Sequence, residues 1–445
     1  MAPTRRPSDG LLARVNFPLY AVDMLTSRHI LVAGGGGSSK TGVANGFEIY
    51  ELYHNGTHFC AEEVLRHETG DNVVMNFAVR NGGRRGYLCA GQEAHCQMYY
   101  VQPSIEADDD ATGDKKNNPV ERPHENGNVR QRAGSGGSHS GVETLANGHG
   151  KPQQLTSAAD ILKQFRSLKF LIQAADVVQT DFLSTSEPLQ RVVRISGNGR
   201  LMATGGTDGH LRIWSFPQMS LGADIPAHSK EIDDLDFSPD SKYLVSISKD
   251  SQGLIWDLSS GKLFKKLIWS TPENSKYLFK RCRYGTVEAQ KDNYRLFTIA
   301  NPLGKVGKQR GYLQQWDANG QLKLAVTIDE SLSSLAVRDD GRFVAVGTMF
   351  SGSVSMYIAF SLQRVLHIPH AHSMFVTGLQ FLPITNEEGP PISSDTEAAV
   401  LSISVDNKVC IHSLPQRRTL PAWIAIVFMI AMIFAVFVLC SYIGI

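Results

Sequence analysis

The sequence is poor in the residues that build metal sites and disulfide scaffolds. Its 445 residues include six cysteines, none of which forms a C-x-x-C pair or a Cys/His cluster with zinc spacing. Scattered cysteines in apolar, strand-like surroundings are typically buried thiols, so this usage favours a reducing compartment. In such a compartment the single N-glycosylation sequon, Asn55-Gly56-Thr57, would stay unmodified.

An excess of charge of one sign is also missing. The chain carries 44 Lys and Arg against 43 Asp and Glu, a net charge of +1, which predicts no general attraction to nucleic acid or anionic lipid. The N-terminal stretch MAPTRRPSDG has no apolar core and is not a signal peptide. The sequence shows neither a catalytic nucleophile with its base nor a helix-turn-helix pattern. These absences disfavour a secreted protein, a DNA-binding protein and a covalent catalyst.

One long hydrophobic run is present at the C-terminus. Residues 421–445, PAWIAIVFMIAMIFAVFVLCSYIGI, include no charged residue. As a helix, Trp423–Ile443 would measure about 31 Å at about 1.5 Å per residue, which matches the hydrocarbon thickness of a bilayer. Trp423 and Tyr442 lie near its ends, where aromatic rings favour the membrane interface. We therefore expect a transmembrane helix over 423–443.

A short basic linker precedes this helix. Arg417 and Arg418 lie within residues 415–422, and almost nothing follows the helix. Because positive charge beside a transmembrane helix favours the cytosolic side, the N-terminal body is expected in the cytosol.

The body contains a repeat. LMATGGTDGHLRIWSF (201–216) recurs as YLVSISKDSQGLIWDL (243–258), with Trp214 and Trp256 42 residues apart. A strand, a tight turn with Asp and a strand that ends near Trp, at this period, are typical of WD-repeat propeller blades. Weaker copies occupy 46–52, 94–101, 311–320, 352–360 and 404–414. Seven copies predict an all-β, seven-bladed WD-repeat β-propeller.

The propeller is expected to span residues 10–414. The last repeat lacks a fourth strand, and LLARVNF (11–17) is suited to supply it and close the ring. Residues 102–157 break the pattern, because they are polar and rich in Gly, Asn and Ser. We expect a disordered insertion there, with the strand pattern resuming at 169–179.

The glycine-rich stretch LVAGGGGSSKTGVANGFEIYEL (31–52) superficially matches a phosphate-binding P-loop. A P-loop needs G-x-x-x-x-G-K-[ST] before a helix whose N-terminus holds the phosphates, but Ser39 occupies the position of the second glycine. Lys40 and Thr41 then lead into GVANG, which cannot start a stable helix. This excludes a nucleotide site of the P-loop kind.

The same stretch is too long for an ordinary blade turn. The predicted strands 29–33 and 47–52 need a hairpin of about two to five residues, whereas 34–46 bridge them. A projecting glycine-rich loop on a rigid scaffold is a common way to build a binding site.

Two features of this loop are shared with a known family: AGGGG at 33–37 and the pattern G-x-x-N from Gly42 to Asn45. Together with the predicted propeller and anchor, they resemble the Sec-type guanine nucleotide exchange factors, and the resemblance covers the whole chain. That family activates the Sar-family GTPase that starts the COPII coat at the endoplasmic reticulum. The resemblance implies an exchange factor in the endoplasmic reticulum membrane, with no nucleotide of its own and no covalent chemistry.

The resemblance also implies site residues, because in that family the loop binds potassium and contacts the GTPase. The implied potassium ligands are Gly34, Gly35, Gly36, Gly37 and Asn45. The implied GTPase-contacting residues are Lys40, Thr41, Gly42 and Asn45.

Other interpretations stay open. Most WD-repeat propellers are scaffolds, so this one could collect coat proteins without changing any nucleotide. The name of one mammalian family member refers to a promoter element, but the only basic stretch that could contact DNA, lipid or an acidic partner is 276–310. His228, Asp250 and Trp256 fit the hydrogen-bond set that stabilises a WD blade rather than a catalytic site.

Overall fold

The structure is a computed structural model of the full chain. It describes residues 10–37, 42–82, 85–104, 169–272, 275–287, 289–304, 310–384, 392, 396–416 and 422–444. The chain divides into two units, of which one combines Met1–Pro103 with Phe170–Ile445. The other, Ser104–Lys169, lies outside the described residues except for its first and last residue.

Seven four-stranded antiparallel sheets are formed by the described residues, which confirms the predicted seven-bladed propeller. Blade 1 has β2 (Leu19–Met24), β3 (His29–Gly35), β4 (Asn45–His54) and β5 (Phe59–Glu68). Blade 2 has β6 (Asn76–Asn81), β7 (Gly86–Gln92), β8 (His95–Ser104) and β9 (Lys169–Gln179). Blade 3 has β10 (Gln190–Ile195), β11 (Leu201–Gly206), β12 (His210–Ser215) and β13 (Ser220–Pro226). Blade 4 has β14 (Ile232–Phe237), β15 (Tyr243–Ser248), β16 (Gly253–Asp257) and β17 (Lys262–Lys266).

The remaining three blades follow the same pattern, except that the last takes its outer strand from the N-terminus. Blade 5 has β18 (Tyr277–Val287), β19 (Gln290–Pro302), β20 (Gly311–Trp316) and β21 (Leu322–Ile328). Blade 6 has β22 (Leu332–Val337), β23 (Phe343–Thr348), β24 (Val354–Ile358) and β25 (Arg364–Ile368). Blade 7 has β26 (Val376–Phe381), β27 (Thr396–Ser404), β28 (Lys408–Pro415) and β1 (Leu11–Arg14).

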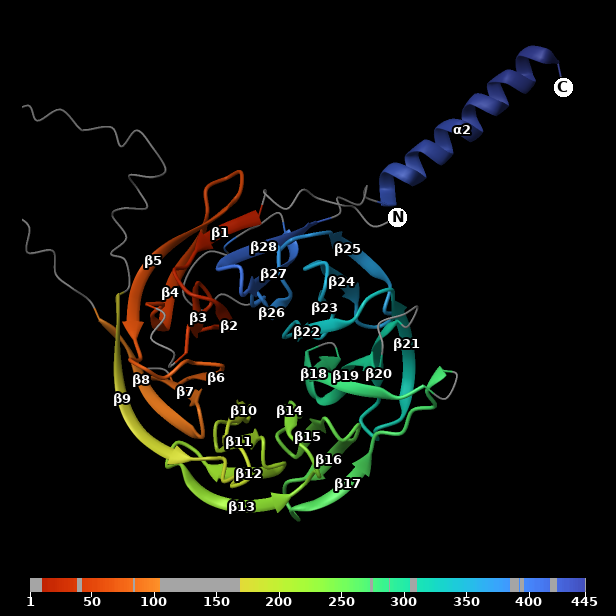
Figure 1. Cartoon of the computed structure of the whole chain (residues 1–445). Coiled ribbons are helices and arrows are strands. Elements are labelled where there is room, and N and C mark those ends of the chain that lie inside the picture. The colour runs from red at the N-terminus through yellow and green to blue at the C-terminus, as the bar shows by residue number, and fades with distance from the viewer. Residues whose placement is uncertain are drawn as a thin grey trace, which may run out of the picture. The chain divides into compact units, whose positions relative to one another are not determined.

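The blades form a closed ring with the first strand of each blade innermost (Figure 1). Residues of these innermost strands line a central channel. Each innermost strand contacts the innermost strands of both neighbouring blades, and β2 contacts β26 where the ring closes. β1 pairs with β28 through Leu11 opposite Cys410 and Ala13 opposite Val409. This confirms the predicted closing strand, and it removes the free sheet edge that blade 7 would otherwise expose.

The core lies between adjacent blades. One cluster joins Cys89 and Met98 of blade 2 to Val193 and Trp214 of blade 3, all at most 5% exposed. Both faces of each blade are buried against a neighbouring blade. The inner strands are therefore nearly continuous runs of apolar residues. Cys89, Cys96, Cys282 and Cys410 are buried free thiols, as predicted, while Cys60 and Cys440 are only partly buried.

One helix follows the propeller in the chain, α2 (Ala422–Ile443). Its segment Ile426–Ile443 has a mean hydropathy of 2.8 and none of it is buried against the protein. The helix is therefore long and apolar enough to cross a membrane, which fits a single-pass membrane protein.

Strand β8 runs on to Ser104, so residues 102–104 are strand rather than part of the insertion predicted at 102–157. Residues 105–157 lie outside the described residues. The strand predicted to resume at 169–179 is β9.

Candidate functional site

The glycine-rich stretch joins β3 to β4, and its ends belong to those strands. Gly34 pairs with Gly46 and Gly35 with Asn45. The connection is therefore residues 36–44, shorter than the loop predicted over 34–46. The predicted loop was too long at both ends, because β3 continues to Gly35 and β4 begins at Asn45. Glycine in a strand can mark a place where another backbone approaches closely, so it does not by itself indicate a loop.

Two close approaches explain the glycines in β3. A Cβ atom on Gly34 would lie 1.8 Å from the carbonyl oxygen of Pro18. Gly35 has φ of +148°, and a Cβ there would lie 2.0 Å from Asn45 Oδ1. Gly34 and Gly35 are thus paired strand residues that let β3 pack tightly, which differs from the free loop in which they were expected.

Asn45 braces the base of the turn. Its side chain is buried, its Oδ1 accepts a hydrogen bond from Gly37 N at 2.9 Å, and its Nδ2 donates to Gly37 O at 3.3 Å. Nδ2 also donates to Gly70 O at 2.9 Å in the segment between blades 1 and 2. One buried amide therefore holds both the start of the turn and the neighbouring inter-blade segment.

Two described positions of the turn need glycine backbone. Gly37 and Gly42 have φ of +83° and +75°, which glycine adopts without strain. Val43 packs against the core cluster between blades 7 and 1. Lys40 and Thr41, predicted to contact a partner, lie outside the described residues.

The turn shares a face of the propeller with the β27–β28 turn of blade 7. Gly35 N donates to Pro18 O at 3.0 Å, and Val15 N, in the same β1–β2 connection, donates to Asn407 O at 2.9 Å. Asp406, next in this turn, accepts a hydrogen bond from Ser373 N at 3.0 Å. We call this side, with the turns 36–44, 405–407, 349–353 and 369–375, the glycine-turn face.

Apolar side chains are exposed on the glycine-turn face. Phe350 is 59% exposed, Met374 49% and Phe375 38%. Their two turns touch, since a Cβ on Gly352 would lie 2.6 Å from Met374 O. Exposed large apolar side chains that are neighbours on one face are typical of protein contact sites.

Polar groups beneath this face stabilise the blades. Ser246 Oγ lies 2.9 Å from Trp256 Nε1 and 2.8 Å from His228 Nε2, and His228 Nδ1 lies 3.1 Å from Asp250. This confirms that His228, Asp250 and Trp256 form a structural hydrogen-bond set. Burial lowers the pKa of His228 more than the Asp250 carboxylate raises it, so the imidazole stays neutral at physiological pH.

Blade 7 repeats the arrangement with a histidine in place of the tryptophan. His372 Nε2 and His412 Nε2 both lie 2.8 Å from Ser402 Oγ, and His372 Nδ1 lies 3.0 Å from Asp406. Burial works to raise the pKa of Asp406, but the hydrogen bond and charge of His372 outweigh it and lower the pKa well below its usual range.

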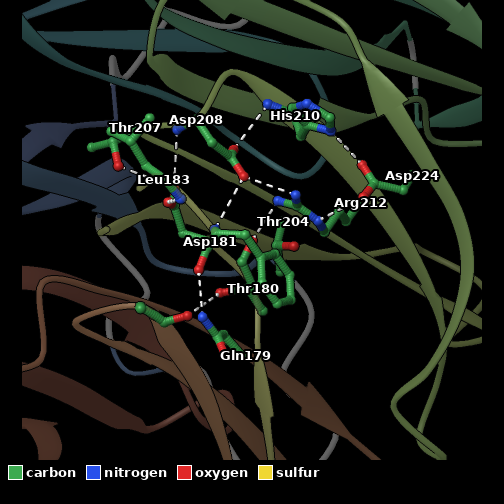
Figure 2. A network of polar contacts seen from close by, with 12 residues as sticks. Gln179, Thr180, Asp181, Leu183, Thr204, Thr207, Asp208, His210, Arg212 and Asp224 are labelled. Atoms are coloured by element: carbon green, nitrogen blue, oxygen red, sulfur yellow. Dashed lines mark hydrogen bonds and ion pairs between the residues drawn. The ribbon is translucent and has the colours of Figure 1, made fainter. Parts of the chain in front are cut away.

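Blade 3 keeps the tryptophan bond, from Trp214 Nε1 to Thr204 Oγ1 at 2.9 Å, but has a network around a buried arginine in place of the His–Asp pair (Figure 2). Arg212 donates to Thr180 O at 2.7 Å and contacts Asp208 at 2.8 Å and Asp224 at 3.2 Å. Asp181 accepts hydrogen bonds from Leu183 N and Asp208 N at 3.0 and 3.1 Å. The hydrogen-bond donors and acceptors of these side chains are paired with one another. The network therefore ties the connection between β9 and β10 to the strands of blade 3 and leaves no free nucleophile within it.

Part of the basic stretch 276–310 faces the central channel. Arg283 contacts Asp234 at 2.5 Å, and Lys280 lies 3.5 Å from Asp233. Burial works to raise the pKa of Asp234, but Arg283 and Arg194 outweigh it and lower the pKa. The positive charge of these residues is therefore neutralised inside the propeller, which weakens the expectation that the whole stretch forms a basic surface.

The donors at the glycine-rich turn are of the kind that potassium prefers. Backbone carbonyls and an amide oxygen are the ligands of potassium sites, and Asn45 Oδ1 has accepted only the Gly37 N–H. The carbonyl of Gly37 already receives Asn45 Nδ2. Among the residues that the structure describes, no group of His, Cys, Asp or Glu could hold a metal ion. The turn therefore presents oxygen atoms of a kind that can bind a cation.

Comparison with known proteins gives this chain its family. The model described as "WD domain, G-beta repeat" matches residues 186–215 and 219–257. The chain is 33% identical over 432 residues to the guanine nucleotide-exchange factor SEC12 of Rattus norvegicus, which covers 95% of this chain and 94% of that protein. The chain belongs to the SEC12 family. The SEC12 protein of Mus musculus matches equally, and SEC12-like protein 1 of Arabidopsis thaliana is 30% identical over 198 residues, 44% of this chain and 46% of that protein.

Membership of the SEC12 family confirms the resemblance found in the sequence. Two site residues of this SEC12-family chain escaped sequence analysis, namely Gly70 and Pro18, whose carbonyls hold Asn45 and Gly35. Their contacts are made by backbone atoms of segments distant in sequence. A turn signal, ETGDN at 68–72, marked Gly70 as a loop residue but could not show what it would touch.

Proposed function

We propose that this chain accelerates nucleotide release from a Sar-family small GTPase at the endoplasmic reticulum membrane, the step that starts COPII coat assembly. The names of the rat and mouse relatives support guanine nucleotide exchange, and the relatives match almost the whole chain. The C-terminal helix supports attachment to a membrane. The observation that carries the proposal is the turn 36–44, held by Asn45 on the same face of the propeller as the exposed Phe350.

An exchange factor needs no covalent chemistry. It must bind the nucleotide-free GTPase more tightly than the nucleotide-bound form, and by reciprocity it then weakens nucleotide binding by the same factor. The hydrogen bonds of Asn45 order part of the turn before the partner binds. Less conformational entropy is then lost on binding, so the contacts with the GTPase weaken nucleotide binding more strongly. Lys40, Thr41, Gly42 and Asn45 remain the proposed contact residues.

The test replaces the turn while keeping the blade. Residues 36–44 of the full chain are exchanged for Asn-Gly, which suits a two-residue hairpin between Gly35 and Asn45. We expect the melting temperature to change little and the acceleration of nucleotide release, followed by fluorescent nucleotide, to fall by about a thousandfold, the equivalent of about 4 kcal/mol.

Two point variants refine this experiment. Asn45→Ala removes the brace and should lower the rate by a smaller factor. Asn55→Ala, an exposed residue in the turn at the other end of β4, should leave the rate unchanged. If the folded turn-replacement protein exchanges nucleotide as fast as the parent, the proposed mechanism is wrong.

A scaffold without exchange activity is the second candidate, because the exposed apolar side chains of the glycine-turn face suit any protein partner. A pull-down with the GTPase would succeed under either function. Only the rate of nucleotide release separates them, since a scaffold binds the GTPase without changing that rate.

We also propose that potassium stiffens the turn, held by carbonyl oxygens among Gly34, Gly35, Gly36 and Gly37 and by the amide oxygen of Asn45. Bound potassium would supply a positive charge that fixes these oxygens. In potassium salt the full chain should unfold at a higher temperature than in lithium salt of equal ionic strength, and exchange should be faster. Asn45→Ala should abolish both differences. Identical unfolding and rates of the parent in the two salts would contradict the proposal.

A further inference from the structure

We infer that the propeller rests on the lipid bilayer with the face opposite the glycine turn, and that Phe360 enters the membrane interface. This face is defined by the turns 338–342 and 359–363 of blade 6, the start of the β26–β27 connection at 382–384, and Gln416. We call it the exit face, because β28 ends there at Pro415.

The two faces are separated by the length of the blade strands. Phe350 precedes β24 and Phe360 follows it, so the two side chains lie at opposite ends of one strand. Phe350 belongs to the glycine-turn face. Phe360 therefore belongs to the exit face, on which Gln416 lines a groove together with Arg342 and Ile384.

The tether between propeller and helix is short. Strand β28 ends at Pro415 and α2 begins at Ala422. At about 3.3–3.6 Å per residue, the chain between them can span at most roughly 25 Å. The headgroup layer itself is about 5–8 Å deep on each side of the hydrocarbon. Once α2 spans the bilayer, the point at which the chain leaves the propeller cannot be far from the lipid surface.

The exit face carries the side chains that a membrane interface favours. Phe360 is 72% exposed and Ile384 is 48% exposed, although burial is the rule for both residue types. The Arg295 guanidinium lies 5.4 Å from the centre of the Phe360 ring. The Arg342 side chain is 63% exposed, with its nearest carboxylate oxygen, on Glu397, at 3.7 Å.

These four residues form one patch. Ala359 N donates to Arg342 O at 2.9 Å, which places the 359–363 turn against the 338–342 turn. Ile384 N donates to the carboxylate of Asp339 at 3.1 Å, which adds the third segment. An exposed aromatic ring flanked by arginines suits the headgroup region of a membrane. Aromatic rings favour this interface, and arginines there contact lipid phosphates.

The short tether favours a lipid surface as the binding partner of this patch. The tether holds the exit face beside the bilayer at high effective concentration, so even weak contacts are occupied. The contacts of this patch with lipid leave the glycine turn, at the other end of the strands, facing the aqueous side. This inference does not depend on nucleotide exchange.

The test uses photocrosslinking in the full chain. Phe360→p-benzoylphenylalanine is compared with Phe350→p-benzoylphenylalanine, a matched control because both rings are exposed and both lie in turns that flank β24. Each protein is reconstituted into vesicles of phosphatidylcholine and phosphatidylserine and irradiated. Lipid adducts on the tryptic peptides are then measured by mass spectrometry.

We expect several-fold more lipid adduct at position 360 than at position 350. Equal yields at the two positions, or a higher yield at 350, would overturn the inference. Adducts from position 360 to a second copy of the chain instead of lipid would overturn it as well. Thermal unfolding of both variants should match the parent, because neither side chain is part of the core.

Discussion

At the scale of single residues, buried polar side chains do the positioning in this molecule. Asn45 joins the glycine turn to the segment between blades 1 and 2 through three hydrogen bonds. His29 is buried at the start of β3, with Nδ1 2.8 Å from Thr26 Oγ1 and its ring 4.8 Å from that of Phe170 in blade 2. Each of these side chains links segments that are distant in sequence, and His29 is the one of the two that can change its charge.

The histidine gives a prediction on pH. Burial, with a smaller contribution from the charge of Arg28, lowers the pKa of His29 from 6.5 to about 4. The unfolded chain therefore binds a proton below pH 6.5 that the folded chain refuses, and stability is lost as pH falls from there towards 4. We expect this residue to remove about 2 kcal/mol of unfolding free energy between about pH 6.5 and pH 5, at about 1.4 kcal/mol per unit.

The measurement is thermal or urea unfolding of the detergent-solubilised full chain across this range. His29→Asn keeps a polar atom near Thr26 but cannot be protonated, so its stability should depend less on pH. An equally steep pH dependence in parent and variant would show that other groups carry the effect.

At the scale of the elements, blades 3, 4 and 7 each contain a small hydrogen-bond set that ties the second and third strands to the preceding connection. In blade 4, Ser246 Oγ of β15 accepts a hydrogen bond from Trp256 Nε1 of β16 and lies 2.8 Å from Nε2 of His228 in the preceding connection. Blade 7 substitutes His412 for the tryptophan. Blade 3 keeps the tryptophan, since Trp214 Nε1 donates to Thr204 Oγ1 at 2.9 Å, and contacts the preceding connection through Arg212. The same geometric need is met by different residues because what matters is that no buried donor stays unpaired.

Ser246→Ala tests this need. The variant leaves the Trp256 N–H and the His228 Nε2 buried without a partner, and we expect a loss of about 3 kcal/mol of unfolding free energy. The matched control is Ser259→Ala, whose hydroxyl bonds Asp257 in an exposed turn and should contribute less than about 1 kcal/mol. Chemical denaturation compares the two variants. A Ser246→Ala loss no larger than that of the control would contradict the structural role.

At the scale of the whole molecule, the chain consists of one closed ring of blades and one apolar helix. The ring protects its sheet edges by pairing β1 with β28, and this closure uses both ends of the propeller sequence. Helix α2 then follows within a few residues of the last strand. A rigid ring on a short tether can present its turns to a partner while staying at one membrane surface.

The expected topology places the ring in the cytosol. Protease added outside sealed microsomes should digest the ring, because Arg417 and Arg418 favour the cytosolic side. Asn55 is an informative reporter, since its sequon lies in an exposed turn where a glycan would meet no obstacle. Protection of the ring from protease, or a glycan at Asn55, would place it in the lumen instead.

The sequence by itself determined the blade number, the closing strand, β9 and the apolar helix. These follow from local periodicity, because the WD repeat recurs about every 42 residues and the strand pattern has a period of two. Asp250 and Trp256 also stand at positions that Asp208 and Trp214 repeat, and His228 fits the same WD pattern, so all three could be assigned before the structure.

The tertiary structure alone decided where the glycine turn begins, what holds it and which way the basic residues point. Gly34 and Gly35 read as loop in the sequence, yet they pair with Gly46 and Asn45 as strand residues. Glycine is needed there because Pro18 and Asn45 approach too closely to leave room for a side chain. Arg283 read as surface charge, yet Asp234 from the neighbouring blade draws it into the channel. Both outcomes depend on contacts between segments far apart in the chain, and no local pattern encodes such contacts until the ring closes and brings those segments together.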